Sequence, residues 1–254
     1  MSVEAVILDW AGTTVDYGCF APVQAFLDAF TEKGIEVSLA EVRQPMGMLK
    51  RDHIKTMLAM PQIQARFVNK YDRNSEDKDI DELLVIFTDK LMKKLAEGTE
   101  LKPYVLEVFN ELKTRGIKIG STTGYTTQML LPVASRAAEL GYKPDVMFTP
   151  DDVNGLGRPH PDMIFANLEA LQVTDKATVI KIGDTVSDIK EAKAAGIKAF
   201  GVLEGSSVLG MSETEWGILS DADKEEHRNA AKAVFLNAGA DGVLTDLRDL
   251  MDYL

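Results

Sequence analysis

Short apolar runs, each followed at once by a polar or glycine-rich turn, constrain the fold of this 254-residue chain most strongly. Most are rich in valine and isoleucine and too short for helices, as buried parallel strands are. The runs are Ala5–Leu8, Ile117–Gly120, Asp145–Phe148, Val179–Ile182, Ala199–Val202 and the weaker Gly242–Leu244. Helical patterns lie between them at Pro103–Arg115, Thr127–Leu140, Pro161–Leu171, Asp188–Ala195 and Asp221–Ala238. This alternation predicts a doubly wound, mainly parallel, Rossmann-like α/β sheet.

One long interval after the first run breaks the alternation. It contains no convincing strand, only amphipathic helical stretches such as Pro22–Lys33 and Ile80–Leu95. At about 80 residues it is far too long for a simple crossover, so we expect an inserted α-helical domain. Within this insert, the polar stretch Asn69–Asp79 is expected to be a loop between helices. The expected domains are an α/β core of residues 1–15 and 100–254 and a helical insert of residues 16–99.

The composition excludes several classes of partner. A net charge of −12 argues against a nucleic-acid groove or a polybasic membrane surface, since both need positive potential. A small anionic substrate would need a local cation or metal. The single cysteine, Cys19, excludes an intrachain disulfide and fits a reducing compartment. There is no basic signal-peptide start and no apolar run of about 20 residues, so we expect a cytoplasmic protein.

Polar residues follow four of the predicted strands, at what should be the same edge of the sheet. Asp9 follows the first strand, Ser121–Gly124 the second, Arg158 a loop after the third, and Asp184 and Asp188 the fourth. Taken singly, each has a simpler interpretation: helix caps or turns for the acids and hydroxyls, and a solvated charge for the arginine. Together they favour one site, because open α/β sheets bind ligands at this edge. The carboxylates could form an oxygen-rich Mg²⁺ site, and the hydroxyls could bind phosphate.

These segments resemble the motifs of the haloacid-dehalogenase superfamily, and the helical insert resembles its cap domain. The resembling motifs are Asp9–Asp16, Ser121–Gly124, Arg158 and Gly183–Asp188. Within the superfamily, further segments resemble the phosphonatase family, whose members hydrolyse phosphonoacetaldehyde. These are Tyr17–Pro22, Pro45–His53, Gly124–Thr126 and Thr149–Val153. The resemblance runs from residue 5 to about residue 210 and therefore covers most of the chain.

The resemblance implies cleavage of a C–P bond, with Asp9 as the nucleophile and Lys50 as the Schiff-base residue. Superfamily phosphatases usually carry an acid two residues after the nucleophile, where this chain has Ala11. Its loss would cost an ester hydrolase about 10²–10⁴-fold in rate, whereas a carbanion leaving group needs an electron sink instead. The alternatives are a relative acting on another phosphonate or a phosphate ester, and a non-catalytic anion-binding relative.

The resemblance also assigns the supporting residues. Mg²⁺ would be held by Asp9, the backbone carbonyl of Ala11, Asp184 and, through water, Asp188, while Thr123 and Arg158 would bind the phosphoryl group. His53 would assist proton transfers, and Met46, Gly47 and Cys19 would lie at the substrate. For His53, Met46 and Cys19 the alternative is an ordinary packed or surface side chain. The resemblance further suggests a homodimer joined through the cap helices.

Overall fold

In this computed structural model, which describes residues 2–96 and 99–254, six strands form one parallel sheet. They are β1 Ala5–Leu8, β2 Lys118–Thr122, β3 Val146–Phe148, β4 Val179–Gly183, β5 Lys198–Val202 and β6 Gly242–Leu244. Their order is β3-β2-β1-β4-β5-β6, so the chain winds outward in both directions from β1 and β4. The predicted doubly wound α/β fold is confirmed. Its ligand site is expected where the direction of winding changes, beside β1 and β4.

Helices cover both faces of this sheet. The helices of the α/β core are α6 Val105–Thr114, α7 Thr127–Glu139, α8 Asp162–Ala170, α9 Val186–Ala195, α10 Glu213–Ile218 and α11 Asp221–Asn237. Three short 3₁₀ segments complete this part, η1 Pro150–Val153, η2 Lys176–Thr178 and η3 Leu247–Tyr253. Alternate residues of β1 face opposite layers: Val6 and Leu8 belong to the core with α6 and α7, and Ala5 and Ile7 to the core with α8, α9 and α11.

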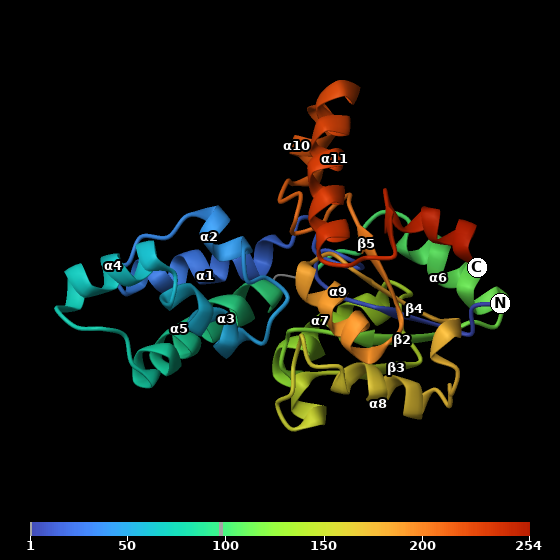
Figure 1. The fold of residues 1–254 in the computed structure, drawn as a ribbon, viewed down its shortest axis with the longest axis horizontal. Helices are drawn as coiled ribbons and strands as arrows, with labels where there is room; N and C mark the ends of the chain where they lie inside the picture. The colour runs from blue at the N-terminus through green and yellow to red at the C-terminus, as the bar shows by residue number, and fades with distance from the viewer. Residues whose placement is uncertain (1, 97–98) are drawn as a thin grey trace.

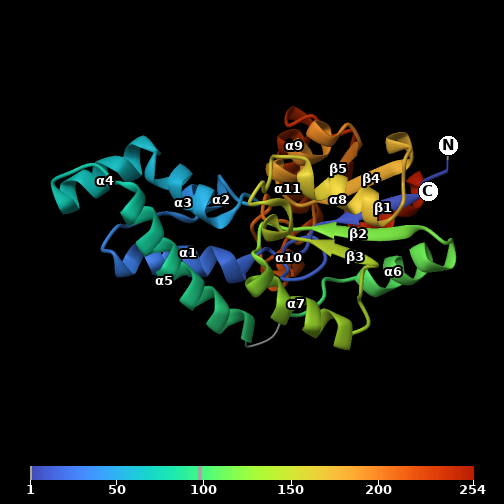
Figure 2. The same ribbon diagram turned by 90° about the horizontal axis from the view of Figure 1, so that it is seen from below.

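A separate group of helices lies to one side of the sheet, as Figures 1 and 2 show. These are α1 Phe20–Glu32, α2 Leu39–Arg43, α3 Lys50–Leu58, α4 Pro61–Tyr71 and α5 Asp77–Ala96. No strand occurs among the described residues of this segment, so the predicted helical insert is confirmed. None of the helices that the structure describes is long and apolar enough to cross a membrane.

The expectation for the polar stretch Asn69–Asp79 was partly wrong. Helix α4 continues to Tyr71 and α5 already begins at Asp77, so only the middle of the stretch is a loop. The α5 start is stabilised by Asp79, whose carboxylate accepts a hydrogen bond from the Glu76 N–H and pairs with Arg73. Polar residues are common in first helical turns, and composition alone therefore misplaced the boundary.

The two chain segments that join the insert to the core run side by side. Val15 and Leu101 form an antiparallel bridge, and the Lys102 N–H donates to the Thr14 carbonyl at 2.9 Å. The side chain of Lys102 is buried and its Nζ donates to the carbonyls of Gly12 and Glu204. These contacts hold the connection against the loop that follows Asp9. The exact domain boundaries, 15/16 and 99/100, stay a prediction.

Candidate active site

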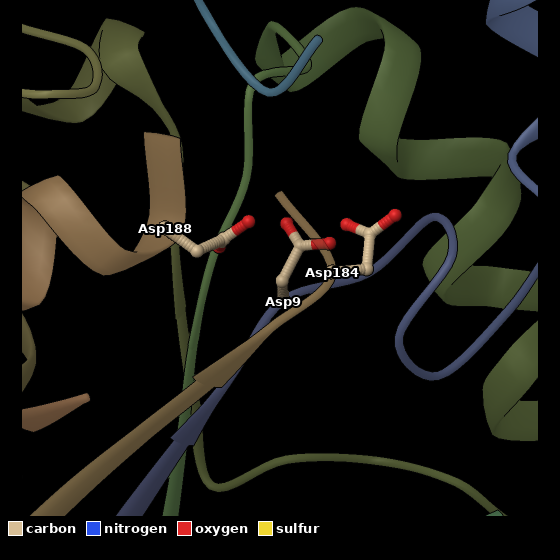
Figure 3. Close-up of side chains that lie close together, drawn as sticks. All are labelled: Asp9, Asp184 and Asp188. Carbon is tan, nitrogen blue, oxygen red and sulfur yellow. The ribbon is translucent and has the colours of Figure 1, made fainter. Parts of the chain in front are cut away.

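Three buried carboxylates meet at the carboxyl edge of the sheet. Asp9 directly follows β1, Asp184 directly follows β4, and Asp188 lies in the first turn of α9. Each offers an oxygen within 4.8 Å of the others, and Figure 3 shows Asp9 between its two partners. Their exposed fractions are 4%, 1% and 0%. The structure therefore brings together the three acidic residues that the sequence predicted as one cluster.

The charges of this cluster are only partly compensated by protein groups. Burial, together with the neighbouring Asp188 charge, raises the pKa of Asp9 against the opposing charge of Arg158. Burial and the charges of Asp9 and Asp188 raise the pKa of Asp184 well above its ordinary value. Asp188 differs: burial opposes its ionisation, but Arg158 and Lys181 lower its pKa overall. A cluster of hard oxygen donors with excess negative charge fits a divalent cation such as Mg²⁺.

Arg158 provides positive charge next to Asp9 and Asp188. Its guanidinium lies 2.7 Å from Asp9 Oδ1, 3.0 Å from Asp188 Oδ1 and 3.1 Å from Glu191 Oε2. Its Nη2 also donates to the Thr122 hydroxyl at 2.7 Å. The side chain is buried, and these carboxylates raise its pKa despite the burial. Arg158 is thus a fixed cation at the site, and not the solvated surface charge it could have been.

Two members of this network were missed by the sequence analysis. Lys181 lies in the middle of β4, fully buried, with its Nζ 3.0 Å from Asp188 Oδ1. Glu191 lies one turn after Asp188 on α9 and contacts both Arg158 and the Thr122 hydroxyl. A signal for Lys181 was available, because a charge inside an otherwise apolar strand requires a buried partner. For Glu191 the only available signal was its spacing of one helical turn from Asp188.

Lys50 reaches the same site from the helical insert. It is the first residue of α3 and is 3% exposed, with its Nζ 5.1 Å from the centre of the Tyr125 ring and 5.8 Å from that of Phe26. Burial among these rings lowers the pKa of Lys50 to about 8, against the raising effect of nearby Cys19 and Asp9. The amine is therefore partly neutral near physiological pH, as a nucleophilic lysine must be.

Both domains line one small cavity, of about 290 Å³ including its mouth. The predicted site residues that line it are Asp9, Ala11, Cys19, Met46, Gly47, Lys50, Thr123, Arg158 and Asp184. Pro22, Gly124, Tyr125 and Thr185 complete the lining. Nine of the predicted residues are thus brought together. Some of them lie in the insert, and the others follow the ends of four different strands.

Two predicted residues do not line this cavity. Asp188 lies behind it, where it holds Arg158 and caps α9 through Thr185. His53 is fully buried beneath Lys50, stacked on Phe26 at 3.9 Å, with Nε2 2.9 Å from the Val42 carbonyl. Burial and the Lys50 charge lower the pKa of His53 well below its ordinary value, so the ring is neutral.

The insert closes tightly over the sheet edge. A Cβ atom added at Gly47 would lie 2.3 Å from the Thr185 hydroxyl, and one at Gly124 would lie 2.9 Å from the Gly47 carbonyl. The Ser187 hydroxyl donates to the Met46 carbonyl at 3.1 Å. Gly47 also has a φ of +88°, so glycine is required there for both space and backbone conformation.

Comparison with known proteins identifies the family. The sequence profile described as haloacid dehalogenase-like hydrolase matches residues 3–196, and a profile described as HAD-hydrolase-like matches residues 155–250. The phosphonoacetaldehyde hydrolase of Lysinibacillus sphaericus is 45% identical, with 98% of this chain and 93% of that protein covered. That of Bacteroides fragilis is 42% identical, with 98% and 94% covered.

A solved structure agrees with these sequence matches. The crystal structure of a phosphonoacetaldehyde hydrolase-like protein from Oleispira antarctica superposes with a TM-score of 0.96 at 37% identity, covering 100% of this chain and 91% of that one. The similarity thus extends over the core and the helical insert alike. The chain belongs to the phosphonoacetaldehyde hydrolase family of the haloacid dehalogenase-like hydrolases.

Proposed function

We propose that this chain hydrolyses phosphonoacetaldehyde to acetaldehyde and phosphate, through an imine on Lys50 and a phosphoryl group on Asp9. One observation carries the proposal: an amine of lowered pKa and a carboxylate from the other domain line the same cavity. An aldehyde at one end of a substrate and a phosphorus atom at the other would meet these two groups simultaneously.

The first stage joins the carbon end of the substrate to the protein. The neutral Nζ of Lys50 attacks the aldehyde carbon, and loss of water leaves an iminium ion. An Asp9 carboxylate oxygen then attacks phosphorus and the C–P bond breaks. The bonding electron pair passes to the carbon and is delocalised into the iminium, which becomes an enamine. Arg158 and Thr123 would hold the phosphoryl oxygens during this transfer.

The second stage restores both residues. Protonation of the enamine carbon gives the iminium of acetaldehyde, and water releases acetaldehyde and the free Lys50 amine. A second water hydrolyses the phosphoryl group on Asp9 and releases phosphate. His53, buried beneath Lys50 with a neutral ring, is proposed to assist the proton transfers during imine formation. Met46, Gly47 and Cys19 are proposed to shape the substrate cavity, which they line.

The metal proposed for the acidic cluster is Mg²⁺. Asp9, Asp184 and the backbone carbonyl of Ala11 would hold it, and Asp188 would act through water. When bound, such an ion would neutralise charge on the phosphoryl oxygens. The raised pKa values of Asp9 and Asp184 support this assignment, because a cation between them would relieve the repulsion that burial enforces.

Ala11 separates this function from its ester-cleaving alternative. The position lines the cavity but offers no side-chain acid to protonate an alkoxide. The decisive assay compares phosphate release from phosphonoacetaldehyde and from p-nitrophenyl phosphate, each with and without Mg²⁺. Faster release from the phosphonate supports the proposal. Faster ester cleavage would favour a phosphatase, and no release from either would favour a non-catalytic relative.

Trapping the imine tests the role of Lys50 directly. Borohydride reduces an imine to a stable secondary amine, so treatment with acetaldehyde present should inactivate the enzyme and leave a two-carbon adduct on Lys50. Lys50→Arg should form no adduct and lose turnover, because a guanidinium keeps its charge. An essential adduct mapped to another lysine would contradict the assignment.

Assembly and location complete the proposal. We infer a homodimer joined through the cap helices, where Val85 on α5 is 70% exposed although it is apolar. Sedimentation velocity of the wild type and of Val85→Asp tests this contact.

A cytoplasmic location is proposed from the single cysteine, Cys19, which suits a reducing compartment.

A further inference from the structure

An arginine of the insert, Arg43, is anchored in the core. It is the last residue of α2, and its Nη1 donates to the Gly18 carbonyl at 2.9 Å and to the carbonyl and hydroxyl of Ser207 at 3.2 Å each. Its Nη2 donates to the Gly210 carbonyl at 3.4 Å, and the guanidinium lies 5.1 Å from the centre of the Phe20 ring. All of these acceptors are neutral, and Ser207 and Gly210 lie in the loop after β5, so Arg43 contacts that loop through hydrogen bonds and not through an ion pair.

The same loop orients one carboxylate of the acidic cluster. The Ser207 N–H donates to Asp184 Oδ2 at 2.7 Å, and both residues are buried. Ser207 therefore contacts Asp184 through its nitrogen and Arg43 through its two oxygens. A single residue joins the insert to the cluster, with one hydrogen-bonded step on each side.

Arg43 also stands at the beginning of the segment that carries the substrate residues. Gln44 to Leu49 follow it directly and lead to Lys50 at the start of α3. The next contact of this segment with the core is the hydrogen bond from Ser187 to the Met46 carbonyl. Arg43 is thus the first along the chain of the contacts that hold this segment, and with it Lys50, against the core; the hydrogen bond from Ser187 and the close packing of Gly47 against Thr185 follow it.

We propose that Arg43, acting through Ser207, couples closure of the insert to cation binding at Asp184. Arg43 is a positioning residue: when the insert closes, its guanidinium fixes Ser207, and the Ser207 N–H holds Asp184 in the orientation found here. Linkage is reciprocal, so a cation at Asp184 must in turn favour the closed position of Lys50. This inference rests on the proposed metal-binding role of the acidic cluster.

Metal binding to the substrate-free protein tests the coupling without an activity assay. Mn²⁺, used as a paramagnetic substitute for Mg²⁺, is titrated into the wild type, Arg43→Gln and Arg73→Gln, and free Mn²⁺ is followed by electron paramagnetic resonance. Arg73 is the matched control, because its charged contact, with Asp79, lies within the insert. We expect Arg43→Gln to weaken Mn²⁺ binding at least about fivefold, the lower end of typical coupling, and Arg73→Gln to leave it unchanged. Arg43→Lys keeps the positive charge but lacks the planar guanidinium, so its Mn²⁺ affinity should lie between those of the wild type and Arg43→Gln.

Hydrogen exchange supplies the second readout. In the wild type, Mn²⁺ should slow amide exchange in the segment 44–50, and in Arg43→Gln this metal-dependent protection should be lost. Melting temperature and circular dichroism identify a variant that has simply unfolded. If Arg43→Gln is unfolded, the Mn²⁺ affinity and the exchange protection of Arg43→Lys test the coupling instead. Unchanged Mn²⁺ affinity and retained protection in a folded Arg43→Gln would overturn the coupling. Loss of affinity and protection in Ser187→Ala but not in Arg43→Gln would also overturn it, and would assign the coupling to the contact between Ser187 and Met46. Failure of the wild type itself to bind Mn²⁺ would instead contradict the proposed metal site.

Discussion

The Nη2 atom of Arg158 lies 2.7 Å from Oδ1 of Asp9, and both side chains are almost completely buried. Asp9, the proposed nucleophile, is therefore already paired with the cation proposed to bind the phosphoryl group. The pair cannot drift apart easily, because Asp188 and Glu191 hold the other guanidinium nitrogens. Protein groups alone thus fix Arg158 beside Asp9, and such preorganisation reduces the reorganisation that catalysis requires.

Substitution of Arg158 by lysine should strongly reduce turnover. One ammonium group cannot reach Asp9, Asp188 and Glu191 together, since it lacks the planar fork of arginine. We expect kcat/KM for phosphonoacetaldehyde to fall by about 10²-fold or more. Arg136→Lys, on the exposed surface of α7, is the control and should retain wild-type turnover. Equal activity of the two variants would exclude Arg158 from the chemistry.

The pH dependence of turnover should report the Lys50 amine. Its pKa is lowered to about 8 by burial, and the neutral form is the nucleophile, so activity rises as pH increases through this value. We expect kcat/KM to increase about tenfold per pH unit below pH ~8 and to level off above it. An unperturbed lysine would carry the rise to pH ~10.4, which initial rates between pH 6 and 10 would distinguish.

Asp184→Asn should separate metal binding from folding. Burial and the charges of Asp9 and Asp188 raise the pKa of Asp184, so removing its charge relieves repulsion in the metal-free protein. We expect the melting temperature without metal to be equal to or above that of the wild type. Mg²⁺ should raise it only in the wild type, because a ligand stabilises the state that binds it. A Mg²⁺-induced shift of wild-type size in Asp184→Asn would exclude this carboxylate as a ligand; Glu169→Ala, exposed on α8, is the control.

Ala11→Asp tests why the general acid is absent. A carboxylate here would face the cavity close to Asp9 and the phosphoryl site. Because the proposed leaving group is an enamine carbon and not an alkoxide, the new acid has no oxygen to protonate. We expect phosphonate turnover to stay equal or to fall, with at most a small gain on p-nitrophenyl phosphate. A clear gain in phosphonoacetaldehyde turnover would refute this explanation.

The sheet and the acidic cluster could be predicted because their signals are local. Each strand is a short apolar run, and parallel strands necessarily bring Asp9 and Asp184 to one edge. The ion pairs of Arg158 could not be predicted in the same way. Its partner Asp9 lies 149 positions earlier in the chain, and the choice between cavity and solvent depends on packing of the whole fold.

The contribution of the insert was predictable only in part. Lys50 was singled out from the resemblance of its segment to phosphonatases, whereas its surroundings include Phe26 from the insert and Tyr125 from the core, and burial lowers its pKa. Arg43 carried no signal at all, because its partners are mainly backbone carbonyls, which every residue possesses. Contacts of this kind depend on loop conformation and leave no pattern in side-chain type.

Gly47→Ala should show how much turnover depends on close contact between the insert and the core. The added Cβ would lie 2.3 Å from the Thr185 hydroxyl, next to Asp184, so the segment before Lys50 must move outward. Gly155→Ala is a matched control: its φ of +80° is close to the +88° of Gly47, but a Cβ there meets no atom within 4 Å. Both variants carry similar backbone strain, and their difference isolates the steric effect. We expect Gly47→Ala to lower kcat/KM by about 10²-fold, as misplacement by about 1 Å does, and to reduce borohydride trapping at Lys50, with Gly155→Ala close to the wild type. Equal turnover of the two variants would mean that this contact does not position Lys50.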